Sequence, residues 1–127
     1  MKKTVERVLE FLKQQGFCPD VDEESGNILF KYQMNTFIYF NNEEDEDFFQ
    51  MGMPHIYDVT EENRELVLEA ANKTCLNIKV IKACVVDESV WIIFENLLDS
   101  SPEVKDILPR ALSIMQAAQQ EFYKNMS

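Results

Sequence analysis

Successive strand-like segments with short connections constrain the fold of this 127-residue chain more than any other feature. Residues 28–32, 36–40 and 48–53 are rich in aromatic and β-branched side chains, which suit a pleated, half-buried surface. Parallel neighbours need a long crossover connection, whereas antiparallel neighbours need only a turn. We therefore expect antiparallel pairing, with a turn at Met34-Asn35, a loop over 41–47, and Pro54 ending the third segment.

Helical patterns lie on both sides of these strands. Apolar residues recur at helical spacing between Val5 and Leu12, and Gly16 lies just beyond, which predicts a first helix over about residues 2–15. A second helix is predicted to begin at a cap on Asp58 or Thr60. Its expected buried stripe consists of Leu66, Val67, Ala70, Ala71, Thr74 and Cys75.

The last part of the chain predicts a β-hairpin and then a final helix. Residues 78–86 and 89–95 form the hairpin strands, joined at Asp87-Glu88. Ser101 and Pro102 stand in the preferred first positions of the last helix. Pro109 is expected to kink that helix or to start a second piece. The apolar stripe that follows consists of Leu108, Ala111, Leu112, Met115, Ala118 and Phe122.

With a short strand between Pro19 and the Ser25-Gly26-Asn27 turn, the order of elements is α-β-β-β-β-α-β-β-α. This order predicts a single α+β domain over residues 1–127. A chain of this length buries a substantial core, so folding requires neither a metal nor disulfides. We expect no signal peptide and no membrane span, because no apolar run is long enough.

The net charge of −11 is distributed unevenly. Residues 18–62 contain twelve acidic residues and one basic residue, Lys31. Such a surface repels phosphate groups, so nucleic acid and anionic membrane are not expected partners. A basic protein segment would suit the run of five acids, which consists of Glu43, Glu44, Asp45, Glu46 and Asp47. Solubility alone is the other explanation of this charge.

Residues that carry chemistry are sparse. The acidic run lacks the central glycine and alternating ligands of an EF-hand. The Met51-Gly52-Met53-Pro54-His55 cluster contains soft-metal ligands, but core packing is the ordinary role of methionine. Cys18, Cys75 and Cys84 have no metal-ligand spacing and are expected to be reduced thiols, mostly in the core of a cytoplasmic protein. With one histidine and no nucleophile–base motif, we expect no enzyme, cofactor or metal.

Two strands are apolar on both faces. In the segment 90–94, Val90, Ile92 and Phe94 would face one side, and Trp91 and Ile93 the other. The segment 37–40 likewise places large side chains on both sides. Because helices on one side of a sheet cover only one of these sets, the other set is expected to meet a helix, a second copy of the chain or a partner.

The sequence also resembles a known family. The second helix reads Val67-Leu68-Glu69-Ala70-Ala71-Asn72, and its Ala-Asn ending leads toward the acidic-tipped hairpin at Asp87-Glu88. Short strands ending near Pro54 lie upstream, and an amphipathic helix lies downstream. This layout, over about residues 3–124, is similar to the YbjN-like family of bacterial sensory-transduction regulators, which shares the fold of type III secretion chaperones. The resemblance implies a curved antiparallel sheet, a homodimer and protein binding without catalysis.

The favoured interpretation is a cytoplasmic, non-enzymatic protein-binding module, either chaperone-like or regulatory. Sheet-face residues such as Tyr39, Trp91 and Ile93 would dimerise the chain or bind an apolar client segment. The acidic residues 43–47 would steer a basic client. The alternative is a small-ligand-binding protein or enzyme with a pocket between the sheet and the C-terminal helix. A structural subunit of a larger assembly is a third interpretation.

Overall fold

The computed structural model describes residues 3–99 and 103–127. Its elements, in chain order, are α1 (Thr4–Gln14), β1 (Asp20–Val21), β2 (Ile28–Tyr32), β3 (Asn35–Tyr39), β4 (Phe48–Asp58), α2 (Arg64–Asn77), β5 (Ile81–Val86), β6 (Ser89–Leu97) and α3 (Val104–Met126). The six strands form one open antiparallel sheet in the order β1-β2-β3-β4-β6-β5. The expected α+β class and order of elements are therefore confirmed.

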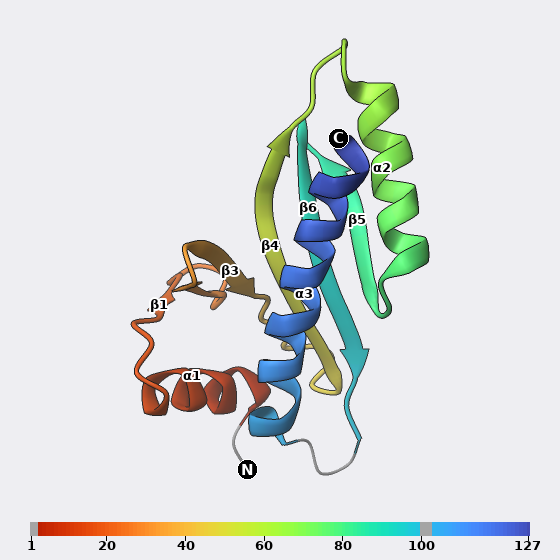
Figure 1. Ribbon diagram of the computed structural model, residues 1–127. Helices are drawn as coiled ribbons and strands as arrows, with labels where there is room; N and C mark the ends of the chain where they lie inside the picture. Colours follow the sequence, from red (N-terminus) through yellow and green to blue (C-terminus); the bar gives the residue numbers. More distant parts are fainter. Residues whose placement is uncertain (1–2, 100–102) are drawn as a thin grey trace.

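The three helices pack on one face of the sheet. In Figure 1, α3 runs along β4 and β6, α2 lies beside β5, and α1 crosses below β1 and β3. Alternate strand residues point into a core under α1 and α3, as the period of two requires. This core includes Ile28, Phe30, Phe37, Phe49, Met51, Met53, Ile92 and Phe94 from the sheet, and Val8, Leu12, Leu108, Leu112 and Met115 from the helices.

Strand β4 does not end at Pro54, in contrast to the sequence-based prediction. Met53 lies opposite Ile92 and Tyr57 opposite Val90, so residues 54–56 face Trp91 alone in a bulge. A bulge leaves backbone groups outside the ladder, and a proline is tolerated there because it has no N–H to contribute. The strand therefore continues past Pro54 to Asp58.

Helix α2 begins later than the expected cap at Asp58 or Thr60. Its N-cap is Asn63, whose side-chain oxygen accepts a hydrogen bond from the Thr60 N–H (2.7 Å), while its own N–H donates to Thr60 Oγ1 (3.2 Å). These bonds hold residues 60–63 in a turn before the helix. The predicted stripe is correct for Val67, Ala70, Ala71 and Thr74, which are buried, and wrong for Leu66 and Cys75, which are exposed.

Helix α3 is continuous through Pro109, so of the two expected alternatives the start of a second helical piece at Pro109 is wrong. Pro109 is exposed in the second turn, where its ring projects from the helix and only the bond to the Lys105 carbonyl is forfeited. Leu108, Ala111, Leu112, Met115, Ala118 and Phe122 are all buried, as predicted. The predicted start at Ser101 and Pro102 lies outside the described residues.

Smaller corrections concern the cysteines and one turn. Cys18 and Cys75 are exposed and Cys84 is partly buried, so the expected core positions are wrong. The β2–β3 turn is formed by Gln33 and Met34, both at positive φ, one residue before the predicted position. Within the described residues, no helix is both long and apolar enough to cross a bilayer.

Candidate functional site

The sheet face opposite the helices carries apolar side chains that belong neither to the core under α1 and α3 nor to a smaller core at α2, which includes Val67, Ala70, Val90 and Phe122. We call this sheet face the outer face, and its members are Leu29, Ile38, Phe40, Cys84, Trp91 and Ile93. Strand pairing places Leu29 opposite Ile38, Ile38 opposite Gly52, and Gly52 opposite Ile93, so these residues form one row across four strands. No described helix covers this row. It is a second apolar surface, separate from the core.

Phe40 and Trp91 form the centre of the outer face. Their rings stack with centroids 6.4 Å apart and an interplanar angle of 25°. Both rings lie over Gly52, where an added Cβ would be 2.8 Å from Phe40 Cε2 and 3.5 Å from Trp91 Cε3. Glycine at position 52 therefore leaves the room in which the two aromatic rings meet.

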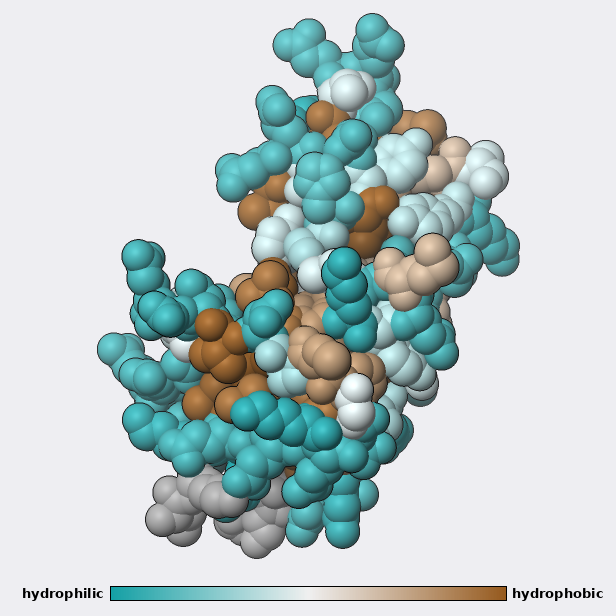
Figure 2. Space-filling model, turned by 90° about the vertical axis from the view of Figure 1, so that its left-hand side faces the viewer, coloured by the Kyte–Doolittle hydropathy of each residue, from teal (hydrophilic) through white to brown (hydrophobic). Residues whose placement is uncertain are grey.

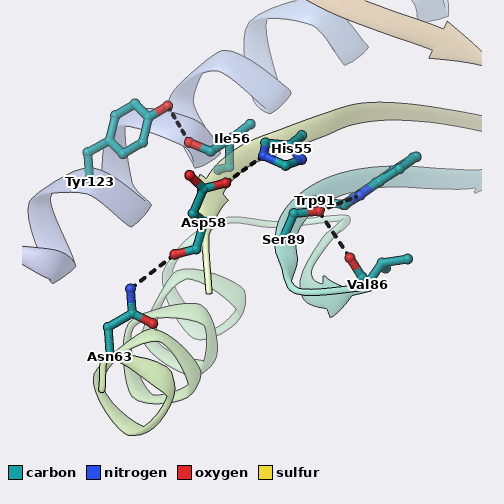
Figure 3. Close-up of polar contacts among 8 residues, drawn as sticks. All are labelled: His55, Ile56, Asp58, Asn63, Val86, Ser89, Trp91 and Tyr123. Atoms are coloured by element: carbon teal, nitrogen blue, oxygen red, sulfur yellow. Dashed lines mark hydrogen bonds and ion pairs between the residues drawn. The ribbon is translucent and has the colours of Figure 1, made fainter. Parts of the chain in front are cut away.

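Hydrogen bonds fix the Trp91 indole on this face (Figure 3). Trp91 Nε1 donates to Ser89 Oγ at 3.1 Å, and Ser89 Oγ donates to the Val86 carbonyl at 3.0 Å. Trp91 remains partly exposed. The prediction that Trp91 and Ile93 face away from Val90, Ile92 and Phe94 is confirmed, because those three are in the core.

Tyr39 does not belong to the outer face, so its predicted place there is wrong. It is 1% exposed in the core, where its ring lies 5.3 Å from that of Phe49. In β3 it is Ile38, with Phe40 just beyond the strand, that points outward. Burial, and to a lesser extent the charge of Glu46, raises the pKa of the Tyr39 phenol.

The acidic loop leads from Phe40 on the outer face to Phe48 at the start of β4. Glu43, Glu44, Asp45, Glu46 and Asp47 are all exposed. Glu46 has a structural role as well: its Oε1 accepts a hydrogen bond from the Thr4 N–H (2.7 Å), and its carbonyl accepts one from Thr4 Oγ1 (2.9 Å). The loop therefore caps α1 through Glu46, and its acidic run begins three positions after Phe40 in the chain.

A cleft of about 370 Å³ lies on the other side of the sheet, between the end of β6 and the first half of α3. Its apolar lining includes Phe94, Leu98, Ile107 and Ile114, and its charged lining is Asp99, Glu103, Asp106 and Arg110. This is the position of the alternative pocket considered from the sequence. The cleft is open, and three carboxylates accompany its one guanidinium.

The single histidine, His55, is not among the residues that line this cleft. His55 Nε2 and Asp58 Oδ1 are 2.6 Å apart on the exposed bulge of β4 (Figure 3). Met51 and Met53 of the same cluster are buried in the core, as expected. Across the described residues, no group of three or more His, Cys, Asp or Glu side chains is placed to hold a metal ion.

Apolar surface is also visible at the side of the molecule that bears α1 and β1–β3. Figure 2 shows it in brown in the lower half of that side, surrounded by hydrophilic residues. The exposed large apolar residues of β1, β2 and the following turn are Val21, Leu29 and Met34. Of these residues, Leu29 belongs to the outer face, whereas Val21 pairs with the buried Ile28 and therefore points to the helix side of the sheet.

Comparisons with known proteins give a structural relationship. No protein-family model matches the chain, and no curated protein matches it. An uncharacterized protein from Methanothermobacter thermautotrophicus has a similar crystal structure, with a TM-score of 0.67 and 13% sequence identity over 97% of this chain and 96% of that one. This similarity supports the α+β fold over nearly the whole chain.

Sequence reasoning considered a pocket between the sheet and the C-terminal helix, but it missed the residues that line it and the cap on α1. The lining brings Val80, Phe94 and residues 96–99 together with residues between 103 and 114, which no local pattern predicts. The cap on α1 comes from Glu46, which is 42 positions from Thr4. The alternation of residues 37–40 indicated that one set of side chains faces outward. It did not show whether that set is Phe37 and Tyr39 or Ile38 and Phe40, because both sets are apolar and large.

Proposed function

We propose that this chain is a cytoplasmic, non-enzymatic protein-binding module, chaperone-like or regulatory, that holds a client protein on its outer face. The observation that carries the proposal is the Phe40–Trp91 pair, a partly exposed aromatic centre that no described helix covers. Tryptophan and other aromatic residues dominate the energetics of protein interfaces because they bury a large area at low entropic cost.

The client segment is expected to be apolar with basic residues beside it. The acidic residues 43–47 begin three positions after Phe40, so their charge would attract a positive segment toward the outer face. The net charge of −11 disfavours acidic partners for the same reason. A homodimer is a further part of the proposal, and it is supported by the YbjN-like resemblance alone.

Affinity capture with a matched pair of variants tests this function. The outer-face variant carries Trp91→Ala and Ile93→Ala, and the control carries Leu66→Ala and Leu68→Ala, two exposed leucines of α2. A client retained by wild type and control, but lost from the outer-face variant, supports the proposal. A client set that is the same for all three proteins rejects it.

Two solution measurements complete the test. The chain contains one tryptophan, so the fluorescence of Trp91 reports directly on the outer face. Client binding there should shift its emission to shorter wavelength, because the indole leaves water. Light scattering of the purified protein gives the oligomeric state. A monomer at micromolar concentration would reject the homodimer, but it would not contradict client binding on the outer face.

A further inference from the structure

Strand β6 extends beyond its neighbour at the edge of the sheet. β5 begins at Ile81, opposite Phe94, whereas β6 continues to Leu97. No described strand residue lies opposite Glu95 or Leu97 on the β5 side. In Figure 1 the lower end of β6 correspondingly runs on below β5.

The hydrogen-bonding direction of these residues follows from the register. Ala83 directs its N–H away from β6, to Cys75 Sγ at 3.2 Å, so the neighbouring Lys82 faces β6 and pairs with Ile93. Backbone groups alternate in direction along an antiparallel strand. Glu95 and Leu97 therefore point their N–H and C=O groups toward the same side as Ile93, at an edge where no described strand continues.

The cleft between β6 and α3 lies directly beside this edge. Val80, which is 51% exposed and directly precedes β5, is one of its lining residues. Val80 has a φ of +64°, a conformation that strains a β-branched residue. The positive φ of Val80 comes directly before Ile81, the first residue of β5 that pairs with β6. No described strand therefore lies on the β5 side of β6 beyond Phe94 or over the apolar floor of the cleft.

We propose that the β6 edge binds an extended segment of a partner protein, added as a strand antiparallel to β6 and in line with β5. Alternate apolar side chains of the segment would fill the cleft against Phe94, Leu98 and Ile107, and the intervening ones would lie beside Leu97, which is 74% exposed. Flanking basic side chains would meet Glu103 and Asp106, since carboxylates outnumber the single Arg110 in the lining. This site is separate from the proposed outer-face function.

Backbone methylation of a probe peptide tests strand addition without altering the protein. The probe is a blocked, fluorescein-labelled peptide of alternating valine and threonine with lysines at both ends, and binding is followed by anisotropy. Methylating one alternate set of amides should weaken binding about tenfold or more, and methylating the other set should leave it nearly unchanged. Equal effects of the two sets, or no binding of the unmodified probe at millimolar concentration, would overturn the proposal.

A matched pair of protein variants locates the site. Leu97→Pro removes the outward N–H and should weaken probe binding about tenfold, whereas Leu97→Ala keeps that N–H and should retain most of it. Circular dichroism checks that both variants fold, and the methylated probes decide the question with wild-type protein if the proline variant does not. Trp91→Ala should leave probe binding intact; its loss in that variant would place the peptide on the outer face instead.

Discussion

The rings of Phe40, which directly follows β3, and Trp91 of β6 stack at 6.4 Å above Gly52 of β4, the strand between β3 and β6 in the sheet. The backbone of β4 is thus sandwiched between the core on one side and an aromatic pair on the other. An aromatic pair of this kind normally lies under a helix or at an interface, because its apolar area is favourable only when removed from water.

Gly52→Ala should destabilise the protein by about 1 to 3 kcal/mol, because the new methyl group would overlap Phe40 Cε2. Urea unfolding measures the loss, and the fluorescence of Trp91 should change with it. The double variant Gly52→Ala with Phe40→Ala has room for the methyl group. Its destabilisation should therefore be smaller than the sum of the two single effects, and simple additivity would refute the proposed contact.

Glu46→Ala should lower the free energy of unfolding by about 1 kcal/mol, because it removes the carboxylate that accepts the Thr4 N–H at the start of α1. Glu44 lies in the same loop and is exposed. Glu44→Ala serves as the control and should change stability by less than about 0.5 kcal/mol. Equal thermal midpoints for the two variants would argue against the cap.

The acidic loop 43–47 is also proposed to steer a basic client toward the protein. Neutralising Glu43, Glu44 and Asp45 together should slow association with a basic client and reduce its salt dependence. Leaving Glu46 in place keeps α1 capped, so stability should change little. Stopped-flow association at two salt concentrations measures this effect. An unchanged rate at low salt would remove the steering role.

Tyr39→Phe should flatten the loss of stability at alkaline pH. Burial raises the pKa of the Tyr39 phenol in the folded state, whereas an unfolded chain ionises it near its ordinary value of 10.0. The unfolded state therefore loses a proton first, and stability declines as the pH rises above about 10. Urea unfolding of both proteins at pH 8 and pH 11 measures the difference. Parallel losses in the two proteins would contradict this linkage.

Pro109→Ala should stabilise the protein by about 1 to 2 kcal/mol. The substitution restores an N–H that can donate to the Lys105 carbonyl inside α3, and it removes the steric clash between the proline ring and that carbonyl. Part of this gain is offset, because alanine leaves the unfolded chain more conformational freedom than proline does. Ser113→Ala, at another exposed position of α3, controls for helix propensity and should gain about 0.5 kcal/mol. A destabilised Pro109→Ala would mean that the proline has a role in the helix start.

Much of the architecture could be read from local patterns. The short connections between strands require antiparallel pairing, and the stripe from Leu108 to Phe122 specifies the buried side of α3. Such signals are local, because they depend on the period of each element. Element ends were less predictable: α2 starts at Arg64 because Thr60 and Asn63 bond each other in a preceding turn.

The sequence by itself determined that Trp91 points away from Ile92, and that Tyr39 points away from Phe40, because side chains alternate along any strand. Only the tertiary structure decided which set the helices cover. The register of β3 with β4 and the packing of α1 and α3 bury Tyr39 and leave Phe40 outside, against Trp91. Both arrangements satisfy the local pattern, and the choice between them depends on contacts between residues distant in the chain.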